Sequence, residues 1–119
     1  MTKEEIKAKW LHELRNGGHE QATGTLKTVK PDGTFGYCCL GVLEEKVLGN
    51  QINAVNLVGL GYTDLKLGLE GHAIIYNRLK EDVIGDRELT DDLINMNDEG
   101  WTLAEIADYI ERDWNTDTN

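Results

Sequence analysis

The sequence predicts an α+β domain in which an N-terminal helix and a C-terminal helical pair pack on one or more β-hairpins, in a single layer of short antiparallel strands. Three observations support this class. Apolar residues recur at helical spacing near both ends of the chain, a stretch of alternating polar and apolar residues precedes a Pro-Asp-Gly turn, and hydrophobic residues make up 39% of the chain. A chain of 119 residues has room for one core, so we expect residues 1–119 to form a single domain.

The first helix is predicted close to the N-terminus. Thr2 and Glu5 have the spacing of a capping box, and apolar residues follow at every fourth position until residues 17–18, two glycines, end the pattern. Residues 25–30 then alternate between polar and apolar side chains. A Pro-Asp-Gly turn and a Phe-Gly-Tyr segment follow within residues 31–37. This second region is therefore predicted to be a β-hairpin.

The middle of the chain gives weaker signals. From Cys38 the apolar residues are spaced as in a buried helix, which the pair Gly49-Asn50 is suited to end in the left-handed conformation. Residues 51–71 contain both apolar residues and several glycines, and we expect a second, short hairpin there. Residues 72–83 again show helical spacing and predict another helix.

The C-terminal helical pair is predicted from two helix starts. Thr90 followed by Asp91 and Asp92 favours the first, because carboxylates are stable near the positive end of the helix dipole. Thr102 and Glu105 form a capping box at the second. The buried side of this last helix is expected to hold Ala104, Ile106, Ala107 and Ile110. Its exposed side is expected to hold Glu105, Asp108, Glu111 and Asp113.

The negative charge is concentrated in the last third of the chain. Residues 1–80 hold ten Lys/Arg and nine Asp/Glu, a net charge of +1, whereas residues 81–119 hold two Arg and thirteen Asp/Glu, a net charge of −11. Such a field repels nucleic acid and attracts basic surfaces. The pattern from Thr90 to Glu111 superficially resembles a helix-turn-helix reader of DNA, but its excess of carboxylates excludes direct binding of nucleic acid as the expected function.

No catalytic, cofactor-binding or metal-ligating pattern is found. His12, His19, His72 and the two cysteines lack metal-ligand spacing, and there is no phosphate-binding loop. The adjacent Cys38 and Cys39 are expected to be buried thiols, with a vicinal disulfide or redox switch as the alternative. No segment is long and apolar enough to span a membrane and no secretory leader is seen, so a cytoplasmic protein is expected.

The candidate site is a protein-binding surface on the C-terminal helices. Acidic helices with exposed aromatic side chains are suited to a basic protein partner, because aromatic residues supply much of the contact energy. The last tryptophan is expected to be exposed since it lies near the end of the chain. The predicted partner-binding residues are Asp91, Asp92, Glu105, Asp108, Tyr109, Glu111, Asp113 and Trp114.

Three blocks of sequence together resemble a family of small proteins encoded by phages and prophages. The blocks run from Lys9 to Arg15, from Tyr37 to Leu43, and from Met96 to Glu111. They are similar to the family's K-W-L-x-x-L-R helix, its Y-C-C-L-G-V-L block and its N-D-x-G-x-x-x-x-E-I-A-x-Y-I-E tail. The resemblance implies a phage accessory protein in the host cytoplasm and brings no catalytic residue with it. The family often has a further cysteine shortly after the Y-C-C-L-G-V-L block, whereas this chain has Glu44 and Glu45 there.

Three functions remain open at this point. The first is a non-enzymatic antagonist of a host DNA-handling defence system, of the restriction or BREX type, which binds a host protein through an acidic face that imitates DNA. The second is a sponge for a nucleotide signal, with Arg15, Lys27, Lys30, Arg78 and Lys80 toward the phosphates and backbone freedom at Gly59 and Gly61. The third is a nuclease or hydrolase that uses carboxylates and a metal. A homodimer is a further expectation, because self-association would enlarge a small core.

Overall fold

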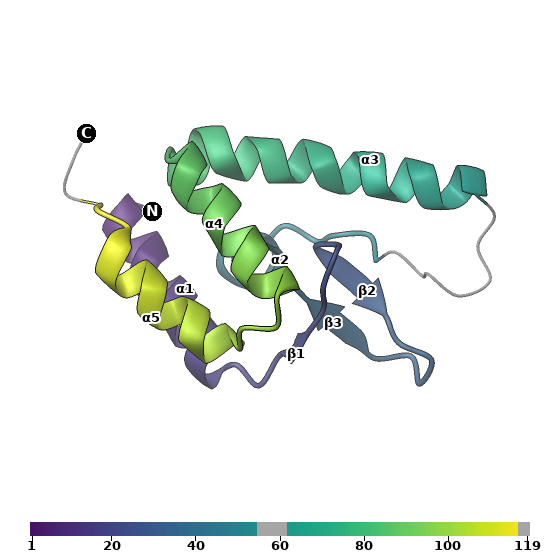
Figure 1. Cartoon of the computed structure of the whole chain (residues 1–119), viewed down its shortest axis with the longest axis horizontal. Helices are drawn as coiled ribbons and strands as arrows, with labels where there is room; N and C mark the ends of the chain where they lie inside the picture. The colour runs from purple at the N-terminus through teal and green to yellow at the C-terminus, as the bar shows by residue number, and fades with distance from the viewer. Residues whose placement is uncertain (55–61, 117–119) are drawn as a thin grey trace.

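The protein is described by a computed structural model that covers residues 1–54 and 62–116, with side chains for all of these except residues 62–69. Figure 1 shows an α+β arrangement, which confirms the predicted class. Two of the elements, η1 and η2, are π-helical turns. In chain order the elements are α1 (Lys3–Asn16), β1 (Glu20–Gln21), β2 (Lys27–Val29), β3 (Phe35–Tyr37), α2 (Cys39–Val42), η1 (Leu43–Val47), α3 (Tyr62–Arg78), η2 (Leu79–Ile84), α4 (Arg87–Asp98) and α5 (Leu103–Asp113).

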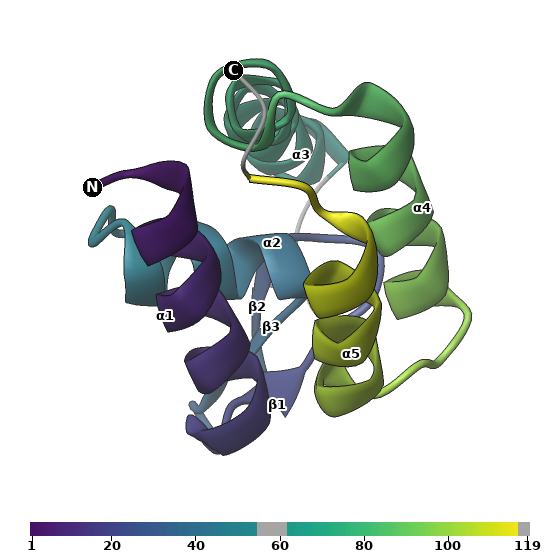
Figure 2. The same cartoon turned by 90° about the vertical axis from the view of Figure 1, so that its left-hand side faces the viewer.

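The short helix α2 lies at the centre of the fold. Figure 2 shows it between α1 on one side and α4 and α5 on the other, while α3 runs along the long axis of the molecule. Leu40, Val42 and Leu43 have no exposed surface. Gly41 permits this packing, because a Cβ atom built on it would lie 2.0 Å from the carbonyl oxygen of Leu26. The buried second helix predicted from Cys38 is therefore confirmed, and Gly49 follows it with a φ of +79°.

The helices α1 and α5 lie side by side (Figure 2) and both begin as predicted. Thr2 and Glu5 form the capping box of α1, and Thr102 and Glu105 form that of α5. The prediction for the buried side of α5 is wrong at Ala104, which is exposed, since Leu103 occupies the inward position. The buried residues that these two helices contribute to the core include Ile6, Trp10, Leu14, Leu103, Ile106, Ala107 and Ile110.

The sheet has the strand order β1-β3-β2 and is mixed. The predicted hairpin is confirmed: β2 and β3 pair antiparallel, Gly33 at the turn has a φ of +86°, and Asp32 Oδ1 accepts a hydrogen bond from Thr34 N–H at 2.9 Å. The strand β1, however, pairs parallel to β3, so the expectation of purely antiparallel strands is wrong. Since β1 has two residues, it offers no alternation from which its pairing could be predicted.

The expectation of a second hairpin within residues 51–71 is not met in the described part of that segment. Residues 51–54 form no strand, residues 55–61 lie outside the described residues, and α3 begins at Tyr62. The predicted helix of residues 72–83 is confirmed as the second half of α3 and η2, but it starts ten residues earlier than expected. Glycine inside a helix costs about 1 kcal/mol, which favourable contacts elsewhere can outweigh.

The start of α4 also differs from the prediction. Asp86 is its N-cap, with a carboxylate oxygen that accepts a hydrogen bond from Leu89 N–H at 3.0 Å. Thr90 is fully buried in the first turn, and its hydroxyl donates to Asp86 O. The threonine therefore satisfies a backbone group inside the helix and does not cap it.

Two consecutive carboxylates on η1 connect this turn to the rest of the structure. Glu44 is 3% exposed and contacts Arg78 and the side chain of Asn50. Glu45 accepts hydrogen bonds from Lys27 Nζ at 2.7 Å, from the Tyr37 hydroxyl at 2.6 Å and from Ile52 N–H at 3.1 Å. These two carboxylates thus anchor the sheet and α3.

The ion pair between Glu45 and Lys27 makes the stability of the fold sensitive to acid. Burial by itself raises the pKa of Glu45, but the hydrogen bonds from Lys27, Tyr37 and Ile52 outweigh it and lower this pKa from 4.5 to about 2. A carboxyl whose pKa is lower in the folded state stabilises the fold above its unfolded pKa. This contribution is lost as the pH falls from about 4.5 through about 2.

We therefore expect Glu45→Gln to lower the free energy of unfolding by about 3 kcal/mol at pH 7, because Lys27 would remain buried without its counter-ion. The variant should also lose the part of the acid sensitivity that lies between about pH 4.5 and pH 2. Urea denaturation followed by circular dichroism at a series of pH values measures both effects. Glu99→Gln, at an exposed position, is the matched control; equal effects from the two variants would contradict the assigned role of Glu45.

Candidate protein-binding site

The structure divides the predicted acidic residues into separate groups. Asp108 and Glu111 on α5 point toward α1 and pair with Arg15 at 2.7 and 2.9 Å. Asp91 on α4 pairs with Lys80 at 2.7 Å and also accepts a hydrogen bond from Tyr76. The carboxylate of Glu105 is used in the capping box of α5. These four residues are thus occupied by contacts within the chain.

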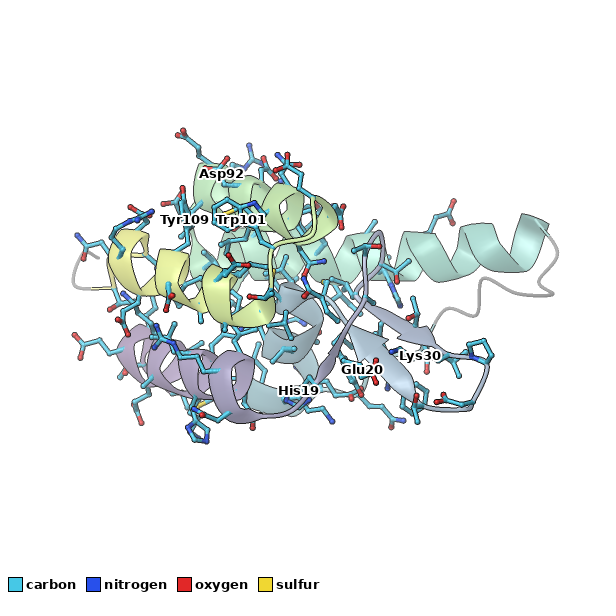
Figure 3. The ribbon with its side chains drawn as sticks, turned by 60° about the horizontal axis from the view of Figure 1, so that its bottom comes forward. His19, Glu20, Lys30, Asp92, Trp101 and Tyr109 are labelled. Carbon is cyan, nitrogen blue, oxygen red and sulfur yellow. The ribbon has the colours of Figure 1, made fainter. Side chains whose placement is uncertain are left out.

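A further group of residues lies on the outer side of α4 and α5. We call it the α4–α5 surface and define it as Asp92, Trp101, Tyr109 and Asp113. Figure 3 shows Asp92, Trp101 and Tyr109 on the same side of the molecule. Arg112 stacks over the ring of Tyr109 at 5.2 Å and pairs with Asp113 at 3.0 Å. Two aromatic rings therefore share one surface with two carboxylates.

Tyr109 is protonated at neutral pH, and its hydroxyl is a hydrogen-bond donor that lies close to Asp92. Its partial burial raises the pKa of its hydroxyl, and the nearby charges of Asp92 and Asp113 raise it further. A tyrosine that combines apolar area with a donor hydroxyl is well suited to a protein interface.

The exposed tryptophan of this surface is Trp101, which sequence reasoning did not select. Its side chain is 41% exposed, yet its backbone is fixed by Trp101 N–H donating to Met96 O at 3.0 Å and by Gln21 donating to Trp101 O at 2.6 Å. An exposed ring on a fixed backbone loses little conformational freedom on binding. The sequence signal was its position directly before a capping box, which lies outside the helix.

The prediction that Trp114 is exposed is wrong. Trp114 is 2% exposed, packs edge-to-face against Trp10 with ring centroids 5.9 Å apart, and donates from Nε1 to Ile84 O at 3.2 Å. The residue lies at the end of α5, but α1 passes beside that end. Trp114 is therefore a core residue and not part of the candidate site.

The α4–α5 surface is positioned by one buried side chain, that of Asn97. Its Oδ1 accepts hydrogen bonds from Cys39 N–H at 3.2 Å and from Gln21 Nε2 at 3.0 Å, and its Nδ2 donates to Ala22 O at 2.7 Å. Asn97 is fully buried. The last turn of α4 is thus held against α2 and β1, which fixes the turn that carries Trp101.

Residues 81–116 keep an excess of unpaired carboxylates in the folded protein. The carboxylates of residues 81–116 that form no ion pair within the described part of the chain are Asp82, Asp86, Glu88, Asp92, Asp98, Glu99 and Glu105. The residues of the α4–α5 surface belong to this negatively charged part of the chain. A field of this sign accelerates encounter with a basic partner.

The basic residues considered for a nucleotide site are not gathered around a ligand. Each pairs with a carboxylate: Arg15 with Asp108 and Glu111, Lys27 with Glu45, Lys30 with Glu20, Arg78 with Glu44, and Lys80 with Asp91. Figure 3 shows the Lys30 and Glu20 pair at the sheet. Gly59 and Gly61 lie outside the described residues. A phosphate would have to displace these carboxylates one by one.

The described residues offer little else for chemistry. No group of three or more His, Cys, Asp or Glu side chains in residues 1–54 and 70–116 is arranged to hold a metal ion. Cys38 and Cys39 are free thiols and both are buried. Likewise, no helix in the described part of the chain has the length and apolarity to cross a membrane.

Comparison with known proteins finds a match, which covers slightly less than half of the chain. Residues 1–56 match a family described as a domain of unknown function, DUF8296. This segment contains α1, the sheet, α2 and η1, whereas the α4–α5 surface lies beyond it. No curated protein and no solved structure matches the chain.

Substitution by alanine of the two tryptophans at the ends of α5 should lower the stability of the protein by different amounts. Trp114→Ala should lower the free energy of unfolding by about 3–5 kcal/mol, because it removes a buried ring, whereas Trp101→Ala should cost less than about 1 kcal/mol. Urea denaturation of both variants measures the difference. Similar losses of stability in the two variants would contradict the assignment of Trp101 to a surface.

The adjacent cysteines should be unreactive in the folded protein. Burial raises the pKa of the Cys38 thiol to about 11 and that of Cys39 well above its usual value. Since the thiolate is the reactive form, a thiol reagent at pH 8 should label neither residue until the chain unfolds. Labelling kinetics with and without denaturant test this expectation. Rapid modification of two thiols in the native protein would show that the cysteines are accessible.

Proposed function

We propose that this protein is a non-enzymatic antagonist of a host DNA-handling defence system, of the restriction or BREX type, and that it acts by binding a host protein. The observation that carries the proposal is the α4–α5 surface, where an exposed Trp101 and a partly buried Tyr109 lie beside Asp92 and Asp113 on well-capped helices. The resemblance to small phage and prophage proteins supplies the biological context.

The chemistry of the surface favours a basic partner. A groove that binds DNA is positively charged, so it attracts carboxylates as it attracts phosphates. Carboxylates on rigid helices can therefore take the place of phosphates in such a groove. The aromatic rings supply the apolar contact that charge alone does not, since tyrosine and tryptophan dominate the energetics of interfaces. Charge thus accelerates association and the rings slow dissociation.

The structure offers less support for the nucleotide sponge. Its five basic residues are engaged by carboxylates at separate places in the fold, and the excess of negative charge opposes an anionic ligand. Protein binding is therefore the function that the geometry supports best.

The proposal is tested by affinity capture from host lysate, followed by binding measurements with the purified captured protein. We expect the partner to be a nucleic-acid-binding protein. A DNA duplex should then compete with this protein for binding to that partner. Association should slow as the salt concentration rises, because the charges are screened. A partner that binds DNA and this protein at the same time would contradict mimicry, and recovery of a second copy of the chain alone would indicate a homodimer instead.

Two variants locate the interface. Trp101→Ala should weaken binding by about 2 kcal/mol, as removal of a central aromatic anchor does. Asp92→Lys should reduce the association rate at low salt more than at high salt. The matched control is Asp82→Lys, which changes the net charge equally at an exposed position of η2. If Asp82→Lys impairs binding as much as Asp92→Lys, the overall charge and not the α4–α5 surface is responsible.

A further inference from the structure

A cavity of about 310 Å³ lies where the loop before β2 meets α3 and α4. Leu26, Tyr76 and Ile94 supply much of its apolar lining, and Thr25 and Asp98 contribute polar groups. Pockets for small ligands in proteins begin at roughly this volume. An apolar cavity of about half this size is enough to bind benzene. The cavity is thus large enough for a fused two-ring molecule.

One of the residues that line this cavity, Thr25, has a polar atom without a partner among the described residues. Thr25 Oγ1 is buried and forms no hydrogen bond with the described residues. A buried hydroxyl without a partner lowers the stability of the empty protein. Thr25 as a residue is only partly buried, so rotation of its side chain can bring the hydroxyl to a molecule in the cavity. A ligand with a matching polar group would satisfy it.

The charge of the lining selects among ligands. Among the lining residues whose side chains are described there is no lysine or arginine. His72 uses both ring nitrogens within the chain: its Nδ1 accepts a hydrogen bond from Leu26 N–H at 3.3 Å, and its Nε2 is left to donate to Asn53 O at 2.7 Å. Asp98 provides the charged group, and its Oδ1 already accepts from Gly24 N–H at 2.9 Å. Its second oxygen can accept from a donor on the ligand, so the site disfavours anions.

We propose that this cavity is a binding site for a small aromatic molecule that carries an amine, with the ring against Leu26, Tyr76 and Ile94 and the amine toward Asp98 and Thr25. This site is separate from the proposed partner-binding function, since its ligand is a small molecule and its test uses the purified protein alone.

Three probes that share one ring system test the proposal. Tryptamine carries an amine, indole carries no charge, and indole-3-acetate carries a carboxylate. Titrations are followed by the NMR signals of the Leu26 and Ile94 methyl groups and by calorimetry. We expect saturable binding in the order tryptamine, indole, indole-3-acetate, with tryptamine about three- to tenfold tighter than indole, as expected for one partly exposed charge-assisted hydrogen bond. Equal binding of tryptamine and indole-3-acetate, or no saturable shift with any probe, would overturn the proposal.

Variants of the lining separate this site from attraction to an acidic protein in general. Ala73→Trp, at an exposed position of α3 that borders the cavity, should abolish binding of tryptamine and indole. Ala8→Trp on the exposed side of α1 is its control and should leave binding unchanged. Asp98→Asn should reduce the affinity for tryptamine toward that for indole, whereas Asp82→Asn, with the same change in charge, should not. Equal effects of Asp98→Asn and Asp82→Asn would refute the cavity as the site.

Thr25→Val gives a second, independent measurement. In the free protein the substitution removes a buried hydroxyl without a partner, so the melting temperature should stay the same or rise. The affinity for tryptamine should fall at the same time. A lower melting temperature with unchanged affinity would show that the hydroxyl serves the fold and not the ligand.

Discussion

The hydrogen bonds of Asn97 are the interaction on which the rest of the structure depends. This one amide meets Cys39 N–H, Gln21 Nε2 and Ala22 O, and so it connects the end of α4 with the start of α2 and with β1. Trp10 adds a second hydrogen bond to the backbone of Cys39, since its Nε1 donates to Cys39 O at 2.9 Å. Because a buried amide that loses a partner costs about 1–3 kcal/mol, these segments are held in one arrangement. The sheet, α2 and the C-terminal helices therefore form one core.

Glu44 and Glu45 serve the same purpose on the opposite side of α2. A buried carboxylate is costly unless it is paired, and each of these has both a cationic partner and further hydrogen bonds. Their partners come from β2, from α3 and from residues 50 and 52. Polar contacts, and not apolar area alone, thus determine where η1 and the segment after it lie.

In the folded protein, basic residues from the first part of the chain pair with some of the carboxylates of the last third. Arg15 and Lys80, which belong to the first 80 residues, pair with Asp108, Glu111 and Asp91. This leaves Asp92 and Asp113 beside the rings of Trp101 and Tyr109. The proposed interface is consequently smaller than the charge pattern suggests, and its anchors are aromatic. The cavity between α3 and α4 shares the α4 helix with this surface but offers different chemistry, because it is apolar inside and carries one carboxylate.

The sequence by itself determined the local features: the capping boxes at Thr2 and Thr102, the hairpin around Gly33, and the buried helix that follows Cys38. Each of these depends on hydrogen bonds between residues close in the chain, so nearby residue types are sufficient to predict it. The tertiary structure alone decided that Trp114 is buried and Trp101 exposed, that β1 runs parallel to β3, and which carboxylates meet Arg15. These outcomes depend on contacts between residues as many as 107 positions apart, such as Lys7 and Trp114. Spacing along one chain carries no information about such contacts, because they are set by how separate elements pack.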